Sequence, residues 1–588
     1  MAWVVPDARH FDSLVDLLDD ATTRWAGRRQ LALRTDDGLH LPWTAAELNR
    51  RSKLVAWRLR ALGLQPGDRL LTWSPATPAL PAVYFGAMRA GVIVVPLDLR
   101  MAPEVLQRLA EKAEAKWLAI GTGFDAPDAA QAGLNHLNIR TVESLGADPP
   151  HERADATDEG GIDEPFPADW EAQVDSWPRP TRDTLFEVIY TSGTTGMPKG
   201  VMLDHGAILS TLEAIRKIIP NREERTVSLL PASHLFDQAP ILFYGLSIGA
   251  DILYLRSRTP RIIFKALAEH RVTTMVVVPQ VLELFWNAIT REIERRGKRR
   301  TFDMVRTIAR RLPYPARRWI FRAVHAQFGG GLNLFICSGA FLPPALQQGW
   351  EDLGVVVMQG YGASESGLAT MTTKRDHGIG TVGRSIPPNE VRLADDGEIL
   401  VRGPAVFPGY FDDPEATRAA FDDEGFYHTG DVGHWDGDGH LVLSGRKKNM
   451  IVLPNGFNVF PEDIENALHI AGIRDAVVLE TQPGRIEAVV LPGEGPAAPR
   501  PAEEQRAAGE RAAEEDAPVA VGEAERARIE EAIKEANRSL GIHQRVEGWR
   551  IWPEADFPRT HTLKVKRDLV RAWVDADAPL KVREGDQA

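Results

Sequence analysis

Short apolar segments alternate with segments of helical periodicity along most of the chain. Apolar runs at 69–73, 92–95, 186–190 and 275–278 are rich in β-branched side chains and are bounded by helix-period stretches. Such runs are typical of buried, largely parallel strands, and their alternation with helices indicates sheets covered by helical layers. The pattern predicts an α/β fold whose large N-terminal domain contains several layered sheets.

The pattern changes after Gly397. Segments 398–402, 425–427 and 441–444 are short strand-like runs between Gly-Asp and Asp-Gly turns, so we expect a small β subdomain here. Beyond it we expect a small α+β C-terminal domain. Residues 492–518 contain no Val, Ile, Leu, Phe, Tyr or Trp, which predicts a disordered insertion within that domain.

Composition narrows the class of protein. At 588 residues the chain exceeds the size of a single core, so at least two domains are expected. The formal net charge of −13 argues against nucleic-acid binding, which needs an excess of Lys and Arg. The one cysteine, Cys337, indicates a reducing compartment, and the longest apolar run, 239–250, is too short to span a bilayer. We therefore expect a soluble, cytoplasmic protein.

A segment rich in Gly, Ser and Thr follows the apolar run that ends at Tyr190 and precedes a segment of helical periodicity. Residues 190–200 are Tyr-Thr-Ser-Gly-Thr-Thr-Gly-Met-Pro-Lys-Gly. Glycines let backbone N–H groups face an anion, hydroxyl groups add donors, and Lys199 adds a positive charge. A P-loop requires Gly before its Lys, but this chain has Pro198, so the kinase and GTPase interpretation fails. Phosphate binding remains the natural use of the segment.

Further motifs follow in a fixed order. They are Gly-Tyr-Gly-Ala-Ser-Glu at 360–365, Gly-Glu-Ile at 397–399 with Gly-Tyr at 409–410, Tyr-His-Thr-Gly-Asp at 427–431, Gly-Arg-Lys-Lys at 445–448 and Pro-Arg-Thr at 558–560. With the Gly-rich segment, they resemble the motifs of the acyl-adenylate-forming superfamily, which includes acyl-CoA synthetases, luciferases and the adenylation domains of peptide synthetases. The resemblance covers about residues 11–574 apart from the predicted insertion. It implies an enzyme that uses ATP and Mg²⁺ to activate a carboxylic acid as an acyl-adenylate.

The resemblance implies a role for each residue of the nucleotide site. Tyr361 would stack on adenine, while Gly339 and Ala340 would present backbone to the base, where a larger side chain would obstruct it. Glu365 would hold Mg²⁺, a hard cation that prefers carboxylate oxygen.

Asp431 would accept the ribose hydroxyl groups, and Arg446 would donate to ribose or phosphate. Taken singly, these two residues are better explained as a hairpin turn and a surface cation, and only their register with the other motifs favours the nucleotide roles. The full implied set of ATP- and AMP-binding residues is Thr191, Ser192, Gly193, Thr194, Thr195, Gly196, Lys199, Gly339, Ala340, Tyr361, Gly362, Ser364, Asp431, Arg446 and Lys564.

Lys564 matches the C-terminal catalytic lysine of the superfamily, which would contact the reacting carboxylate and the α-phosphate. A positioned ammonium stabilises the charge that grows on the α-phosphate oxygens in the transition state. Leu563 stands where the superfamily usually has Gly, a departure that long-chain fatty acyl-CoA synthetases often share. Lys566 is the competing candidate, because in an extended segment it would share a face with Lys564.

Residues 230–238 (Leu-Pro-Ala-Ser-His-Leu-Phe-Asp-Gln) indicate the same subgroup. His234 would border the acyl pocket, and it joins Lys199, Glu365 and Lys564 in the implied catalytic set. Phe236 and the run 239–249 would supply apolar walls, although most of that run is equally explained as core. Asp237 offers an alternative, because amino-acid-activating relatives place an Asp nearby to hold the substrate ammonium. The resemblance to the His-x-Phe-acid-Gln run of long-chain synthetases is the better match.

The resemblance implies two half-reactions in one site. Residues 1–445 would hold ATP and the acid, and residues 446–588 would form a lid with its hinge at 445–449. Lys199 and the Gly-rich loop would hold the β- and γ-phosphates while pyrophosphate leaves, and the acyl-adenylate would stay shielded from water. The lid would then rotate about Lys448 and bring Gly456 beside a tunnel for the thiol of CoA.

The predicted product is the CoA thioester of a medium- or long-chain fatty acid. An acyl-AMP ligase that loads a carrier protein or another acceptor would carry the same motifs for the first half-reaction. A non-catalytic acyl or nucleotide sensor is a second alternative, with Leu563 as a sign of decay. Retention of the lysines, the acidic residues and Arg446 together argues against it.

A basic stretch lies within residues 291–322. It contains Arg295, Arg296, Lys298, Arg299, Arg300, Arg306, Arg310, Arg311, Arg317 and Arg318, and Trp286, Phe302, Trp319 and Phe321 are interleaved with it or lie nearby. These residues lead to the hypothesis of peripheral contact with the inner membrane surface. The alternative is a solvated helical face paired with acidic neighbours, which is the usual outcome for a charge run.

Overall fold

The chain folds into two compact units. The first contains residues 1–342, 346–391 and 401–427, and the second contains residues 343–345, 392–400 and 428–588. The computed structural model describes residues 10–35, 38–122, 127–148, 166–191, 198–219, 224–257, 259–454, 458–493, 522–559 and 565–576. No helix within these ranges is long and apolar enough to cross a membrane.

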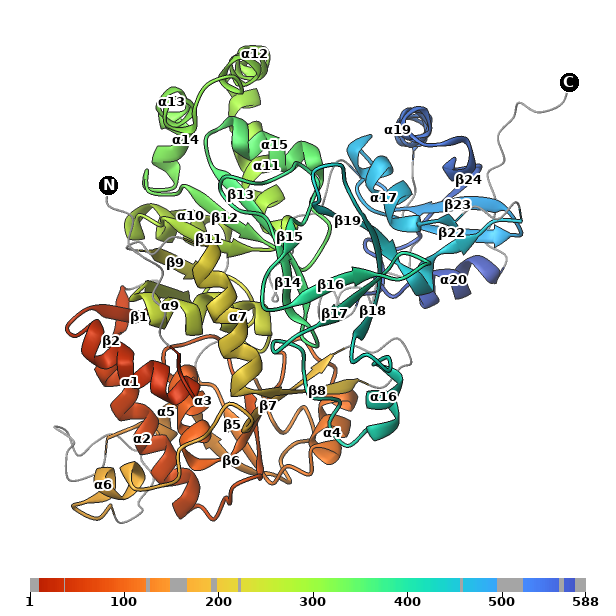
Figure 1. Ribbon diagram of the computed structural model, residues 1–588. Helices are drawn as coiled ribbons and strands as arrows, with labels where there is room; N and C mark the ends of the chain where they lie inside the picture. Colours follow the sequence, from red (N-terminus) through yellow and green to blue (C-terminus); the bar gives the residue numbers. More distant parts are fainter. Residues whose placement is uncertain are drawn as a thin grey trace, which may run out of the picture. The chain divides into compact units, whose positions relative to one another are not determined.

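A six-stranded sheet in the first unit has the order β6-β5-β3-β4-β7-β8. Figure 1 labels four of its strands, β5, β6, β7 and β8. Neighbours from β6 to β7 run parallel, and β8 is antiparallel to β7. Its strands are β3 (Arg69–Trp73), β4 (Ile93–Pro96), β5 (Trp117–Ile120), β6 (Asn138–Thr141), β7 (Leu185–Thr191) and β8 (Lys199–Asp204). The predicted strands at 69–73, 92–95 and 186–190 are therefore confirmed as β3, β4 and β7.

Two further sheets complete the strands of the first unit. One has the order β11-β12-β13-β14-β15, with β11, β12 and β13 parallel and the later pairs antiparallel. The other has the order β2-β1-β10-β9. Their strands are β1 (Arg29–Arg34), β2 (Leu39–Thr44), β9 (Arg225–Ser228), β10 (Asp251–Leu255), β11 (Thr274–Val277), β12 (Leu334–Cys337), β13 (Val356–Ala363), β14 (Gly367–Met371) and β15 (Arg384–Ser385).

Helices accompany these sheets, and their ends carry local signals. The Thr44 hydroxyl caps α2 by accepting from the backbone N–H of Glu47, and Gly91, at φ 68°, ends α3. The helices are α1 (Leu14–Arg24), α2 (Ala45–Ala61), α3 (Ala79–Ala90), α4 (Pro103–Lys112), α5 (Val142–Leu145), α6 (Trp170–Asp175), α7 (His205–Ile218), α8 (Leu235–Asp237), the π-helix η2 (Gln238–Phe243), α9 (Tyr244–Ile248), α10 (Pro260–His270), α11 (Pro279–Arg295), α12 (Arg299–Ala309), α13 (Tyr314–Ile320), α14 (Arg322–Gln327), α15 (Pro344–Asp352) and α16 (Pro414–Ala419).

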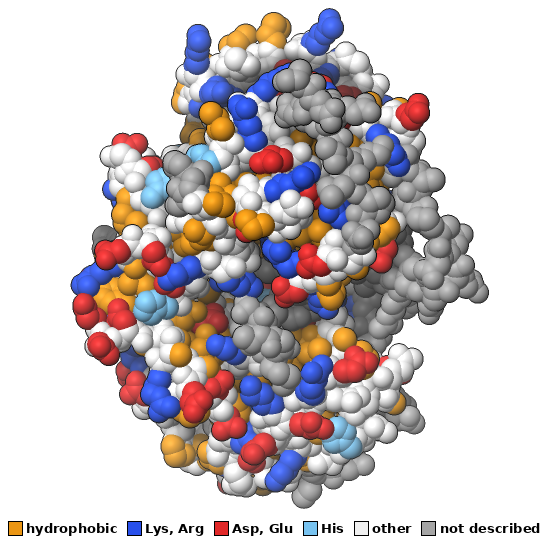
Figure 2. Space-filling model, turned by 90° about the vertical axis from the view of Figure 1, so that its right-hand side faces the viewer, with side chains coloured by type: hydrophobic (Ala, Val, Ile, Leu, Met, Phe, Trp, Pro, Cys, Tyr) orange, Lys and Arg blue, Asp and Glu red, His pale blue; other side chains and the backbone are white. Residues whose placement is uncertain are grey.

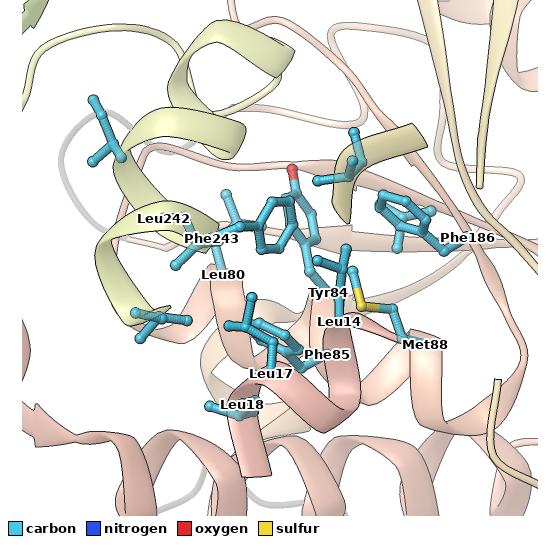
Figure 3. Packing of buried hydrophobic residues seen from close by; sticks show 14 of the residues in the cluster. Leu14, Leu17, Leu18, Leu80, Tyr84, Phe85, Met88, Phe186, Leu242 and Phe243 are labelled. Carbon is cyan, nitrogen blue, oxygen red and sulfur yellow. The ribbon is translucent and has the colours of Figure 1, made fainter. Parts of the chain in front are cut away.

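The core of the first unit is densest around α3, which is buried along its whole length. A helix that is apolar on all sides needs packing partners on all sides. Figure 3 shows these partners, with side chains of α3 packed against those of α1, η2 and β7. The labelled residues are Leu14, Leu17, Leu18, Leu80, Tyr84, Phe85, Met88, Phe186, Leu242 and Phe243.

The second unit contains most of the sheet β16-β17-β18-β19 and the sheet β22-β23-β24. The strands are β16 (Glu390–Leu393), β17 (Glu398–Arg402), β18 (Tyr427–Trp435), β19 (Leu441–Arg446), β20 (Ile451–Val452), β21 (Asn458–Val459), β22 (Ala476–Gln482), β23 (Arg485–Val490) and β24 (Gly548–Ile551). The helices are η3 (Lys447–Asn449), α17 (Pro461–Ile470), α19 (Glu523–Ser539), η4 (Ile542–Gln544) and α20 (Arg567–Asp575). Of the predicted insertion at 492–518, residues 494–518 lie outside the described residues.

The basic stretch forms parts of four helices, α11 to α14. Phe302 and Phe321 are buried in the core beneath these helices, and Trp286 packs partly buried against them. The expectation that these three aromatic side chains face a membrane is therefore wrong, because the amphipathic helices turn them inward. Trp319 is exposed.

Two of the basic side chains serve a buried carboxylate. Asp352, at the end of α15, has a fully buried side chain. Arg310 donates to it twice, at 2.9 Å from Nε to Oδ1 and 2.8 Å from Nη2 to Oδ2, and Arg306 Nε lies 3.4 Å from Oδ2. A buried charge needs such partners, so these two arginines have a structural role.

We expect the double variant Arg306→Gln/Arg310→Gln to destabilise the first unit by about 3 kcal/mol, because it leaves a buried carboxylate without a cation. Urea unfolding followed by tryptophan fluorescence measures the change. The matched control, Arg295→Gln/Arg296→Gln, breaks ion pairs with the more exposed Glu292 and should cost less than about 1 kcal/mol. Equal losses in the two variants would contradict the structural role.

Candidate active site

The Gly-rich segment connects two antiparallel strands. Thr191 ends β7, Lys199 begins β8, and the two residues are direct partners in the β7–β8 pairing. Ser192, Gly193, Thr194, Thr195 and Gly196 lie outside the described residues. The segment of helical periodicity does follow, as α7 from His205, but β8 comes first. This intervening strand is a further difference from a P-loop, in which the lysine lies at the start of a helix.

The edge of β8 pairs with a distant segment of chain. The backbone N–H of Phe411 donates to the carbonyl of Gly200 at 2.7 Å, and that of Met202 donates to the carbonyl of Gly409 at 3.1 Å. Between them, Val201 and Tyr410 form an isolated antiparallel bridge. The predicted Gly-Tyr motif at 409–410 therefore acts as a short extra strand beside the predicted phosphate-binding lysine.

Tyr410 links the two charged residues assigned to the triphosphate. Lys199 Nζ lies 4.7 Å from the centre of the Tyr410 ring, and the Tyr410 hydroxyl donates to Glu365 Oε1 at 3.4 Å. Burial raises the pKa of Tyr410, and the Glu365 charge raises it further, so the hydroxyl remains a donor at neutral pH. The sequence predicted Lys199 and Glu365 but gave Tyr410 no role, because 211 and 45 residues separate Tyr410 from them along the chain.

Glu365 stands in the tight turn between β13 and β14. Ala363 pairs with Gly367, and the Ser366 hydroxyl accepts from the backbone N–H of Ala363 at 2.9 Å. A Cβ on Gly362 would lie 2.0 Å from the carbonyl oxygen of Gly367, so only glycine fits there. The backbone N–H of Phe407 donates to the Glu365 carbonyl at 2.8 Å, which fixes the turn from the other side.

The residues predicted to contact the adenine base lie at the ends of two neighbouring parallel strands. Gly339 and Ala340 come directly after β12 and are exposed, while Tyr361 lies in β13 and is buried. The register pairs Cys337 with Gln359, so Gly339 and Tyr361 lie at the same edge of the sheet. Gly339 has φ 88°, a conformation that favours glycine, and a Cβ there would meet the Val278 side chain at an ordinary 3.5 Å.

His234 is held by a carboxylate that the sequence did not reveal. His234 Nε2 lies 3.2 Å from Oδ2 of Asp98, which is buried just beyond β4. Arg100 also binds Asp98 through Nε at 3.0 Å and Nη2 at 2.9 Å. Burial by itself would raise the pKa of Asp98, but the hydrogen bonds from His234 and Arg100 hold it well below its usual range. Asp98 is therefore a permanent anion that orients the His234 ring.

A small cavity adjoins the His234 segment. Its lining includes Leu80, Tyr84, Gln238 and Leu242, from α3 and η2. π-Helices such as η2 are rare in proteins, and those that occur are often found at functional sites. Gln238 donates to the buried carboxyl group of Glu187 at 2.8 Å, and burial raises the pKa of Glu187 to about 8.

Asp237, which the sequence also offered as an ammonium-binding residue, is buried beside the same cavity. Its Oδ1 accepts from the Ser228 hydroxyl at 2.7 Å. Much of the predicted apolar run 239–249 forms η2 and α9 and is buried in the core.

The two remaining predicted nucleotide residues face each other in the second unit. Asp431 and Arg446 are direct partners in the β18–β19 hairpin, and Arg446 Nε lies 2.7 Å from Asp431 Oδ1. Both side chains keep some exposure, 15% for Asp431 and 43% for Arg446. The ion pair orients the Asp431 carboxylate, whose two oxygens both act as acceptors.

Glu398, another residue that sequence reasoning missed, supports this hairpin. It accepts from the backbone N–H of Gly430 at 3.0 Å, from His428 at 3.1 Å and from Lys447 at 2.8 Å. Burial opposes its ionisation, but these donors lower the pKa of Glu398. The only sequence signal was its place in the Gly-Glu-Ile motif at 397–399.

The predicted hinge residue Lys448 lies in η3, is exposed, and directly follows Lys447. Gly456 and Lys564 lie outside the described residues. The competing Lys566 is exposed at the start of α20, and its backbone N–H donates to the Pro558 carbonyl at 2.7 Å. The choice between Lys564 and Lys566 therefore stays a prediction.

Comparison with known proteins shows the family to which the chain belongs. The sequence profile of the family described as AMP-binding enzyme matches residues 21–411. The chain is 30% identical to a long-chain-fatty-acid–CoA ligase of Mycobacterium bovis, over 91% of this chain and 92% of the relative. It is 28% identical to a feruloyl-CoA synthase of an Amycolatopsis species, over 77% and 84% of the two chains.

The fold matches solved structures as well. An anthranilate CoA ligase, AuaEII, in complex with anthranoyl-AMP superposes with a TM-score of 0.70 at 18% identity, over 97% of this chain and 99% of that one. The α/β fold predicted from the sequence, with a large N-terminal part and a small C-terminal part, is thereby confirmed. Because the family profile matches more than half of its length, the chain belongs to the family of AMP-binding enzymes.

Proposed function

We propose that this chain activates a carboxylic acid with ATP, releasing pyrophosphate, and then transfers the acyl group from the acyl-adenylate to CoA. The observation that carries the proposal is the Lys199–Tyr410–Glu365 cluster. It places a cation and a carboxylate on either side of one tyrosine, next to the strand ends that flank the Gly-rich segment. A triphosphate needs this combination, with a lysine for its oxygens and a carboxylate for its metal ion.

The residues present suit Mg²⁺ bound together with a nucleotide. No group of three or more His, Cys, Asp and Glu side chains among the described residues is placed to hold a metal ion. Mg²⁺ in nucleotide sites commonly takes one or two carboxylates and fills its shell with phosphate oxygens and water. Glu365, half-buried in its turn, meets that requirement. Bound there, Mg²⁺ would neutralise charge on the phosphates.

We assign the acid to the neighbourhood of His234. Asp98, the partner of His234, lies beyond the carboxyl end of β4, and Thr191 ends the parallel neighbour β7. Asp98 and Thr191 therefore lie at one edge of the sheet. The small nearby cavity is lined by apolar and polar residues, with Leu80 and Leu242 beside Tyr84 and Gln238, and it would have to widen to admit an acyl group. A medium- or long-chain fatty acid is the proposed substrate, supported by the name of the relative that aligns along nearly the whole chain. The feruloyl-CoA synthase makes an aromatic acid the alternative.

The second half-reaction is assigned to movement of the C-terminal region about Lys448. The proposed hinge at 445–449 begins at the end of the β19 strand that carries Arg446. Transfer to a carrier protein instead of CoA remains the rival, because it requires the same first half-reaction.

Mass spectrometry of the products from a mixture of fatty and aromatic acids with ATP and Mg²⁺, with and without CoA, tests the proposal. We expect pyrophosphate and acyl-adenylate without CoA, and pyrophosphate, AMP and an acyl-CoA when CoA is present. Formation of ADP, or no acyl-adenylate from any acid, would contradict the proposed function. Acyl-adenylate that never becomes acyl-CoA would favour the carrier-protein alternative.

Lys564→Ala should slow ATP–pyrophosphate exchange by about 100-fold, because a preorganised cation is lost from the transition state of adenylation. Thioester formation from supplied acyl-adenylate and CoA should stay near the unmutated rate. The matched control is Lys566→Ala, which should retain exchange. The reverse result in the two variants would transfer the catalytic role to Lys566.

Asp98→Asn should raise KM for the acid by about tenfold, since His234 loses the charge-assisted hydrogen bond that orients it. KM for ATP should stay the same, which a general loss of folding would not produce. Asp251→Asn, which breaks a comparable ion pair with Arg29 in another sheet, is the control and should leave both values unchanged. An unaltered KM for the acid in Asp98→Asn would refute the positioning role.

A further inference from the structure

The outer face of α12 and α13 carries large apolar side chains in contact with solvent. Met304 and Ile308 are each 59% exposed, and Trp319 is 70% exposed. Met304 and Ile308 are four residues apart in α12, so they stand on one side of the helix. In Figure 2, the end of the first unit that carries α12 in Figure 1 shows hydrophobic side chains between two projecting Lys or Arg side chains.

The inner face of the same helices already has its partners. Phe302, Ala309 and Phe321 are buried in the core, and Arg306 and Arg310 are held by Asp352. The helices are thus fixed from within, and the outward apolar residues are not needed for the core. Met304 and Ile308 share one side of α12, and the contacting helix α13 exposes Trp319; exposed apolar side chains of this size on neighbouring helices indicate a binding surface.

Basic side chains surround these apolar residues. Lys298, Arg300 and Arg311 are exposed, and no carboxylate among the described residues lies within ion-pair distance of them. Arg322 stacks over the ring of Trp319, 5.2 Å from its centre. Residues 291–322 contain twelve Lys and Arg but three Asp and Glu, in a chain whose net charge is −13.

We propose that Met304, Ile308 and Trp319, with Lys298, Arg300 and Arg311, form a surface that binds the face of an anionic lipid membrane. We call it the α12–α13 surface. The apolar side chains would enter the interface while the cations meet lipid phosphates, a combination that single hydrophobic or charged residues do not provide. Since the chain as a whole is acidic, an anionic membrane would repel its other faces and orient this one toward the lipid.

Charge favours a membrane over a second copy of the chain. Two α12–α13 surfaces brought face to face would oppose like charges, which is costly in a desolvated contact. An anionic lipid layer supplies the complementary sign. The inference goes beyond the proposed function, because it depends on surface chemistry and holds whichever acid is activated.

Co-sedimentation with phosphatidylglycerol vesicles and with phosphatidylcholine vesicles, at low and high salt, tests the surface. The unmutated chain should bind phosphatidylglycerol vesicles at low salt and be released by high salt. Lys298→Gln/Arg300→Gln/Arg311→Gln should weaken this binding about 100-fold, because each basic residue near the surface contributes roughly a factor of five. Met304→Ser/Ile308→Ser/Trp319→Ser should weaken it about tenfold or more and leave the salt dependence in place.

Two matched controls carry equal changes elsewhere. Lys116→Gln/Arg261→Gln/Lys265→Gln removes three exposed cations, and Ile470→Ser/Ile542→Ser/Leu569→Ser removes three exposed apolar side chains. Both should bind as the unmutated chain does. Equal recovery in the supernatant with and without anionic vesicles, or equal weakening by the controls, would overturn the proposal. Sedimentation equilibrium showing a dimer that both surface variants dissociate would assign the surface to self-association instead. None of these measurements depends on ligase activity.

Discussion

Two main-chain hydrogen bonds between β8 and the segment 409–411 hold the candidate active site in register. Backbone pairing fixes its partners to within a fraction of a residue, whereas a pair of long side chains would leave several rotamers open. Lys199 and Tyr410 come from parts of the chain more than two hundred residues apart, yet the bridge at Val201 and Tyr410 places them side by side. Glu365 then depends on Tyr410 for its hydrogen bond and on Phe407 for its backbone. If the edge of β8 were unpaired, no main-chain contact would hold Lys199 and Glu365 at a fixed distance from each other.

The direction of the strands explains where the other candidate residues lie. Parallel strands deliver their carboxyl ends to one edge of a sheet, and ligand sites in such sheets form beyond that edge. In one sheet, Asp98 follows β4 and Thr191 ends its parallel neighbour β7. In another sheet, Gly339 follows β12 and Tyr361 lies in its parallel neighbour β13. The antiparallel strands β8 and β14 then run back along β7 and β13. The same arrangement accounts for tight turns such as Gly362, where the protein has no room for a side chain.

Local features were well predicted from the sequence, and long-range contacts were not. The apolar runs at 69–73 and 186–190 became β3 and β7 almost residue for residue, because buried strands leave a continuous apolar signal. β8 was missed, since its six residues merge into the Gly-rich segment and the helix that follows. Asp98 pairs with His234 across 136 positions, and no spacing rule connects residues that meet only through the sheet. Tyr410 and Glu398 were visible inside motifs, but their roles depend on partners that only folding brings near.

The second unit is assembled from separate stretches of the chain, and this limits how it was able to evolve. Residues 392–400 belong to it although they precede residues 401–427 of the first unit. They supply Glu398, which accepts from Gly430, His428 and Lys447. A gene segment starting at His428 would encode the hairpin without the carboxylate that supports it. The residues from His428 onward therefore do not form a self-contained exchangeable unit. Recombination that exchanges them between related genes has to include the strand at 398–402, unless the recipient protein supplies an equivalent carboxylate.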